Sequence, residues 1–194
     1  MSPRKSVEQE LTRDMIIDTA RTLFAQSGYQ HVSMRKIAQA LEYSHGALYY
    51  HFQNKAELFY AIVAKDFSLL NHLLIEIMNE ELTNTEKVKK ILLRFIQFGL
   101  DYPNHYELMF LTRNRDIQQH LQMAPVESYE QFAQTLSTLC GSRVTAQAIW
   151  SVFLAVHGFV SVHCRNEQTY EEVEGVAKTH IRFMLKGLGI EEEG

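Results

Sequence analysis

Proline and glycine are scarce in this sequence, with three prolines and nine glycines among 194 residues. A sandwich or barrel of many short strands needs more tight turns than these residues can supply. Hydrophobic residues make up 46% and charged residues 22% of the sequence, as in an ordinary globular protein. The composition therefore favours a folded chain built from helices.

Cysteine is equally rare. Cys140 and Cys164 do not have the spacing of a metal-binding motif, and both lie in apolar helical patterns, so we expect buried free thiols. The N-terminus lacks the ordered regions of a signal peptide, and no run of about 18 apolar residues predicts a membrane span. We expect a cytoplasmic protein with no membrane partner.

Positive charge is also in short supply, because the net charge is −4. The charge is unevenly distributed, however. Residues 1–60 contain seven basic and six acidic residues, so they carry +1 while the remainder carries −5. A nucleic-acid binder needs a basic face rather than a basic chain, so DNA binding by the N-terminal part remains possible.

Helical periodicity recurs along the whole chain, and we find no convincing strand. Thr12, Ser33 and Ser44 are placed to cap helices, and Thr83-x-x-Glu86 and Thr169-x-x-Glu172 have the spacing of capping boxes. We expect an all-α fold of about nine helices, at residues 12–26, 34–41, 45–52, 54–79, 83 to at least 99, 104–111, 125–139, 143–165 and 169–187. Residues 1–53 are predicted to form a mobile arm and a DNA-binding domain, and residues 54–194 a helical effector-binding and dimerisation domain.

The second and third expected helices are short and joined by a tight turn, as in a DNA-reading helix-turn-helix. Leu48 and Phe52 are four residues apart and are predicted to face inward. Small residues at Gly46 and Ala47 would let the third helix approach base edges closely. Ser44 leaves the positive helix N-terminus available for a phosphate.

The same region resembles the tetracycline-repressor (TetR) family. The resemblance covers about residues 12–60 and rests on Leu23-Phe24-Ala25-x-x-Gly28-Tyr29, Ser33-Met34-Arg35-Lys36-Ile37-Ala38 and Gly46-Ala47-Leu48-Tyr49-Tyr50-His51-Phe52-x-Asn54-Lys55-x-x-Leu58. The remainder is similar in architecture only, together with Trp150 and His157-Gly158. The resemblance implies a two-fold, Ω-shaped homodimer whose N-terminal heads bind DNA and whose helical domain dimerises and often binds a small effector.

Two residues depart from the family pattern. Glu42 and Tyr43 occupy the turn where the family usually has glycine and valine. If Glu42 takes a positive φ, it costs on the order of 1 kcal/mol and tilts the recognition helix slightly. His45 is not the commonest residue at its position, so the operator sequence does not follow from the resemblance.

The resemblance predicts ten DNA-binding residues, against the alternative of an ordinary solvated surface: Ser33, Arg35, Ser44, His45, Gly46, Ala47, Tyr49, Tyr50, His51 and Lys55. Arg35 is expected on a guanine or a phosphate, and His45 and Tyr49 on DNA more generally. Tyr50, His51 and Lys55 suit phosphates, which set register without specifying sequence.

Residues 143–165 carry two apolar stripes, so the helix there is expected to be buried on two sides. One side is predicted to meet a second subunit, together with the helix at 169–187, although a purely intramolecular core is the alternative. Aromatic residues and methionine are concentrated between Phe95 and Phe110. This segment either lines an effector pocket or forms ordinary core; the pocket residues we expect are Phe98, Tyr102, His105, Met109, Phe110, Trp150, Phe153 and His157.

No phosphate-binding loop, nucleophile elbow or two-histidine metal helix is present, so we do not expect an enzyme. His157 and Cys164 share a helix face, but no third ligand has a fixed spacing, and we predict neither a metal nor a cofactor. We expect a transcriptional regulator, most simply a repressor, that binds double-stranded DNA as a homodimer and is released by a small apolar or aromatic effector. The alternatives are a non-enzymatic helical adaptor and a metal-responsive regulator.

Overall fold

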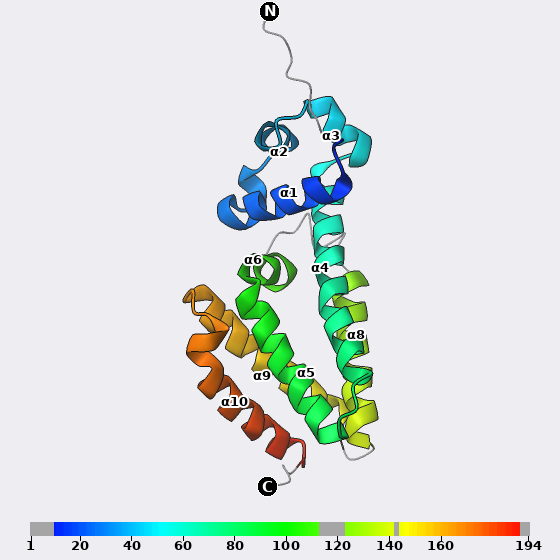
Figure 1. Cartoon of the computed structure of the whole chain (residues 1–194), viewed down its shortest axis with the longest axis vertical. Coiled ribbons are helices and arrows are strands. Elements are labelled where there is room, and N and C mark those ends of the chain that lie inside the picture. The colour runs from blue at the N-terminus through cyan, green and yellow to red at the C-terminus, as the bar shows by residue number, and fades with distance from the viewer. Residues whose placement is uncertain (1–9, 113–122, 142–143, 191–194) are drawn as a thin grey trace, which may run out of the picture. The chain divides into compact units, whose positions relative to one another are not determined.

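The computed structural model describes residues 10–112, 123–141 and 144–190. Within these ranges the chain forms nine α-helices, one 3₁₀ turn and one π-helical turn, with no strand, so the all-α prediction is confirmed (Figure 1). The arm predicted at the N-terminus lies almost wholly outside the described residues. The elements are α1 (Arg13–Ser27), η1 (Tyr29–His31), α2 (Met34–Ala40), α3 (His45–His51), α4 (Lys55–Met78), α5 (Asn84–Asp101), α6 (Pro103–Tyr106), η2 (Glu107–Leu111), α8 (Met123–Cys140), α9 (Ala146–Arg165) and α10 (Tyr170–Gly187).

The helix starts follow from local side-chain chemistry. The hydroxyl groups of Thr12, Ser33 and Ser44 each accept a hydrogen bond from the backbone N–H three residues later, at 3.2 Å. Both predicted capping boxes are present, at Thr83 and Thr169. These bonds satisfy N–H groups that have no partner inside the helix, which is why such short motifs fix where a helix begins.

Some element boundaries differ from the predictions. Helix α8 begins at Met123, two residues before Pro125, and α9 begins at Ala146 after the Thr145 cap. The helix expected at 104–111 is the single turn α6 followed by the π-helical turn η2, which closes with a bond from the Thr112 N–H to the Glu107 carbonyl at 2.8 Å. A π turn holds one residue more than an α turn, and the apolar pattern alone does not distinguish the two.

The described residues fall into two compact units, one ending at Ile62 and the other beginning at Val63. The units part within α4, whereas the division predicted from sequence lies just before this helix. The first unit is α1–α3 with the start of α4, around a core that includes Ile16, Phe24, Ile37, Leu48, Phe52 and Phe59, each at most 1% exposed.

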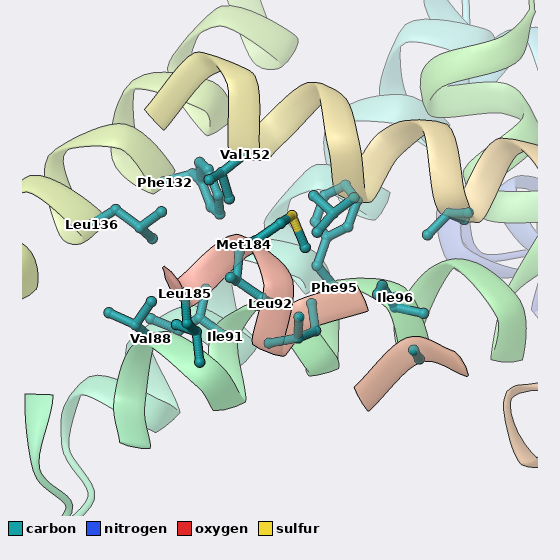
Figure 2. Packing of buried hydrophobic residues seen from close by; sticks show 14 of the residues in the cluster. Val88, Ile91, Leu92, Phe95, Ile96, Phe132, Leu136, Val152, Met184 and Leu185 are labelled. Atoms are coloured by element: carbon teal, nitrogen blue, oxygen red, sulfur yellow. The ribbon is translucent and has the colours of Figure 1, made fainter. Parts of the chain in front are cut away.

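In the second unit, α5 packs against α8, α9 and α10. Val88, Leu92 and Ile96 of α5 meet Phe132 and Leu136 of α8, Val152 of α9, and Met184 and Leu185 of α10, as Figure 2 shows. Gly99 allows α5 to approach its neighbour closely. A Cβ at this position would lie 2.3 Å from a methyl carbon of Val160.

Two helices have the length and composition of a membrane span, although the sequence has no unbroken run of about 18 apolar residues. The most apolar 18-residue windows of α4 and α9 reach mean hydropathies of 1.4 and 1.3, and 39% and 22% of these windows are buried. Core helices of helical proteins meet the same criteria, and α4 carries Lys65 and the buried Asp66.

Candidate nucleic-acid interface and effector cavity

Helices α2 and α3 form the predicted helix-turn-helix. The turn between them contains Glu42, which takes a positive φ of 61°, and is closed by a bond from the Tyr43 N–H to the Ala38 carbonyl at 3.0 Å. Leu48 and Phe52 are buried at 0% and 1% exposure, so the inward face of α3 is confirmed.

The opposite face of α3 presents aromatic and imidazole groups to solvent. His45 and Tyr49 pack edge to face with ring centroids 4.8 Å apart, and Tyr49 is 45% exposed. Tyr50 is 89% exposed and packs against the His51 ring at 5.3 Å. These side chains carry hydrogen-bonding groups with little apolar burial, which is the composition of a surface that meets a polar partner.

Gly46 and Ala47 lie on the first turn of α3. An added Cβ at Gly46 would meet no atom of the protein within 4 Å, so internal packing does not require glycine there. Arg35, on α2, is exposed. The hydroxyls of Ser33 and Ser44 are bound to backbone N–H groups as helix caps, so their main contribution is to place α2 and α3.

Lys55 is placed differently from the other predicted DNA contacts. Its ammonium donates to the carbonyls of Tyr29 and Val32 at 2.9 and 3.0 Å, and lies 4.0 Å from the centroid of the Tyr29 ring. Burial lowers the pKa of this ammonium. Lys55 therefore links α4 to the segment that leads into α2, in addition to any role at a phosphate.

Sequence reasoning missed Arg13. Its guanidinium donates to the carbonyl of His51, at the C-terminal end of α3, and stacks over the Phe52 ring at 4.0 Å. A cation at this end of a helix is favourable because the last carbonyls carry partial negative charge. The two partners are 38 residues apart in sequence, so no local pattern signals the contact.

The second unit contains an apolar cavity of about 530 Å³, including the space at its mouth. The wall comes from α4, α5, η2, α8 and α9. Of the residues predicted for an effector pocket, Phe110 and Phe153 line this cavity. Trp150 and His157 stack on Phe153 from outside the lining, with ring centroids 5.4 and 6.0 Å away.

The remaining predicted pocket residues lie elsewhere. Phe98 is buried and packs against Tyr102 and His105, whose Nδ1 lies 3.1 Å from the buried Asp66 carboxylate without the alignment of a hydrogen bond. Met109 is buried on η2. The structure therefore does not bring these four side chains to the cavity, whereas α4 and α8, which sequence reasoning did not consider, supply much of its wall.

A polar pair, formed by the buried Tyr106 and the half-buried His157, lies next to the aromatic wall. The hydroxyl of Tyr106 is 2.5 Å from Nδ1 of His157, and the Ser161 hydroxyl bonds to the His157 carbonyl at 2.7 Å. Burial raises the pKa of Tyr106 above its ordinary value, so the phenol stays protonated. Its O–H group then donates the hydrogen bond to Nδ1 of His157. Burial also lowers the pKa of His157, which favours the neutral ring that this bond requires.

Comparison with known proteins agrees with this geometry. Residues 16–62 match the family described as "Bacterial regulatory proteins, tetR family". The chain is 28% identical over 155 residues to the HTH-type transcriptional regulator AcrR of Shigella flexneri, a match covering 70% of this chain and 67% of AcrR. It is 29% identical over 99 residues to the negative transcriptional regulator IcaR of Staphylococcus aureus, covering 51% of this chain and 52% of IcaR. The chain thus matches about half to two-thirds of the length of these relatives.

The fold has solved counterparts over almost the whole chain. The transcriptional regulator FadR from Bacillus subtilis, solved in complex with stearoyl-CoA, superposes with a TM-score of 0.78 at 18% identity, covering 91% of this chain and 99% of FadR. The helix-turn-helix, the family match and the helical second unit agree with one another. Residues 16–62 therefore carry the match to the tetR family of bacterial regulatory proteins, and AcrR, which matches over 70% of the chain, is a transcriptional regulator.

Proposed function

We propose that this protein is a homodimeric repressor that binds a pseudo-palindromic DNA operator and is released by a small apolar effector. The observation that carries the proposal is the outward face of α3, where His45, Tyr49 and Tyr50 are exposed beside a glycine that internal packing does not need. A helix with this face fits the major groove, which is wide enough to admit it. IcaR, a relative named as a negative transcriptional regulator, supports repression over activation.

Within the interface, we assign His45 and Tyr49 to base edges, with Ala47 beside them. Arg35, Tyr50 and His51 are assigned to the phosphate backbone, where they set the register of the protein on the duplex. Two heads related by two-fold symmetry would read half-sites about one helical turn apart, roughly 34–36 Å, or somewhat more. By occupying such a site near a promoter, the dimer would exclude RNA polymerase.

The dimer surface we propose is the exposed face of α9 and α10. Trp150, Leu154 and Val162 lie at multiples of four residues along α9 and are 45–57% exposed. Gly158 belongs to the same stripe, and a Cβ there would meet nothing within the chain. On α10, Val176 and Phe183 are 58% and 77% exposed. Large apolar side chains exposed along two helices are typical of a surface that a partner covers.

The effector site we propose is the cavity of the second unit. Most of its lining is apolar, with a few polar groups among the apolar side chains, as is typical of small-molecule sites. The stearoyl-CoA bound to FadR supports an apolar effector for this fold. Helix α4 supplies cavity residues from Phe67 to Ile77 and begins at Lys55, beside the helix-turn-helix. An effector that favours one arrangement of α4 would change operator affinity in proportion to its preference between the two states.

The test is selection of bound fragments from host genomic DNA, followed by footprinting of the enriched site. We expect protection of a pseudo-palindrome and a steep loss of binding as salt rises. His45→Ala should weaken binding to the selected site by about 1–3 kcal/mol while leaving binding to random duplex nearly unchanged. Failure to enrich any sequence, or equal loss on both duplexes, would contradict the proposal.

A further inference from the structure

The polar residues of the cavity are few. Four of the 15 lining residues are polar, namely Asn71, Arg94, Ser128 and Tyr129. In a site with a mostly apolar wall, such groups fix the orientation of the ligand and set its chemical class. We propose, building on the proposed function, that the effector is an amphipathic acid, whose apolar chain fills the cavity and whose negatively charged end is held at Arg94.

Arg94 supplies the charge. It lies on α5, is exposed to solvent, and uses Nη1 to donate to the Gln97 side chain at 3.0 Å. A guanidinium has five N–H donors arranged to match a carboxylate or a phosphate, so it retains donors for a ligand. Among the residues that the structure describes, no aspartate or glutamate lines the cavity. In a chain of net charge −4, a site with one cation and no anion selects for a negatively charged ligand.

A second polar point lies in the wall. Ser128 of α8 is 6% exposed, and its hydroxyl donates to the side-chain oxygen of Asn71 on α4 at 2.7 Å. This pair is neutral, so it suits a carbonyl or hydroxyl of the ligand rather than a second charge. Tyr129 adds a phenol to the same wall.

The rest of the wall suits a hydrocarbon chain. Phe67 and Phe110 contact one another edge to face at 5.3 Å, and Phe95 and Phe153 do so at 6.1 Å. Together with leucine and isoleucine side chains of α4, these rings offer no hydrogen-bonding partner. A hydrocarbon chain would bury apolar surface here, while the charged end of the ligand remains at the solvent-exposed Arg94.

The sole tryptophan reports on the site. Trp150 stacks on Phe153 and packs edge to face on Tyr129 at 4.9 Å, and both of these rings line the cavity. We would titrate the full chain with dodecanoate, dodecanol, dodecylammonium and lauroyl-CoA, following Trp150 fluorescence and confirming each Kd by calorimetry. Dodecanoate and lauroyl-CoA are the two acids in this set. Dodecanoate carries its negative charge on a free carboxylate, whereas lauroyl-CoA is a thioester whose negative charge lies on phosphates.

At least one of the two acids should bind about tenfold or more tightly than dodecanol, and dodecylammonium should bind most weakly. Arg94→Gln should reduce the preference for the acid to about threefold or less, and Arg94→Lys should restore part of it. Lys186→Gln makes the same change of charge on α10 outside the lining and should leave every Kd unchanged. Whichever of the two acids binds more tightly shows whether the effector carries its charge on a carboxylate or on phosphates.

Dodecanol binding as tightly as both acids, an unchanged preference in Arg94→Gln, or no binding of any of the four compounds in calorimetry would overturn the inference. A parallel measurement of operator affinity with each ligand separates this result from the proposed function. Release of DNA by dodecanol, with dodecanol binding as tightly as both acids, would keep the proposed induction and reject recognition of the acid. Tight, Arg94-dependent binding of an acid without loss of operator affinity would keep the inference and reject induction.

Discussion

The guanidinium of Arg13 lies 4.0 Å from the centroid of the Phe52 ring while it donates a hydrogen bond to the carbonyl of His51. One side chain of α1 thus holds both the last turn of α3 and the residue that follows it. The orientation of the recognition helix therefore depends on a residue outside the helix-turn-helix.

We predict that Arg13→Gln weakens operator binding about threefold to tenfold and lowers the free energy of unfolding by about 1 kcal/mol, because a cation–π contact and a helix-terminal bond are lost. Fluorescence anisotropy with operator duplex and urea unfolding measure the two effects. The control is Arg35→Gln, an exposed residue on α2, which should weaken binding without changing stability. Unchanged binding and stability in Arg13→Gln would show that Arg13 does not position α3.

Lys55→Met should reduce the free energy of unfolding by about 1–3 kcal/mol, since it leaves the carbonyls of Tyr29 and Val32 without their charged donor. Urea unfolding monitored by circular dichroism measures the loss. Lys36→Met is the matched control, because Lys36 is exposed and its ammonium donates to the Ser27 hydroxyl only at 3.4 Å. If the two variants are equally stable, Lys55 acts at the DNA alone.

Glu42 and Glu167 both have a positive φ, of 61° and 55°. We expect replacement of either by glycine to raise the free energy of unfolding by up to about 1 kcal/mol, because glycine relieves the strain at the cost of some unfolded-state entropy. Only Glu42→Gly should also alter operator affinity, since Glu42 lies in the turn before α3. Calorimetric unfolding and anisotropy would test this pair, and destabilisation of both variants would contradict it.

The proposed dimer surface leads to a contrast between neighbouring positions of α9. Leu154→Asp, on the exposed stripe, should yield a folded monomer in sedimentation velocity at micromolar concentration. Val160→Asp should instead unfold the chain, because Val160 is fully buried and an unpaired buried charge costs several kcal/mol. A dimer that persists in both Leu154→Asp and Phe183→Asp would place the interface elsewhere.

Acid should destabilise the second unit through His157. Its pKa is lowered in the folded state, so the stability that this neutral ring contributes is complete above about pH 6.5 and falls as the pH drops from there towards the folded pKa. His157→Phe keeps the ring stack but does not titrate. The loss of unfolding free energy between pH 7.5 and 5.5 should therefore be smaller in this variant than in the original chain, and an equal loss would contradict the assignment.

Sequence reasoning succeeded where the physical cause is local. The caps at Thr12, Thr83 and Thr169 and the inward face of α3 each depend on residues within a few positions of one another. It failed where the cause is a distant partner. Tyr106 and His157 are 51 residues apart, so no local sequence pattern predicts the hydrogen bond between them.

The lining of the cavity also depends on residues that are distant in sequence. The aromatic segment between Phe95 and Phe110 is compatible with either a pocket or ordinary core, because composition does not say which rings face a cavity. Tyr102 and His105 pack against Phe98 instead, while α4 and α8 supply wall residues such as Leu74 and Tyr129. Apolar periodicity predicts which face of a helix is buried, not whether that burial is against protein or around a space.

The π-helical turn η2 makes this segment sensitive to the deletion of a single codon. Because a π turn contains one residue more than an α turn, removing a single codon between Glu107 and Met109 would leave a continuous α-helix. The shortened chain would turn Phe110 by about 100° relative to Tyr106. A deletion of three nucleotides could then keep Tyr106 on His157 or Phe110 in the cavity wall, but not both. The reading frame and the helix would survive, whereas the combined placement of Tyr106 and Phe110 would not.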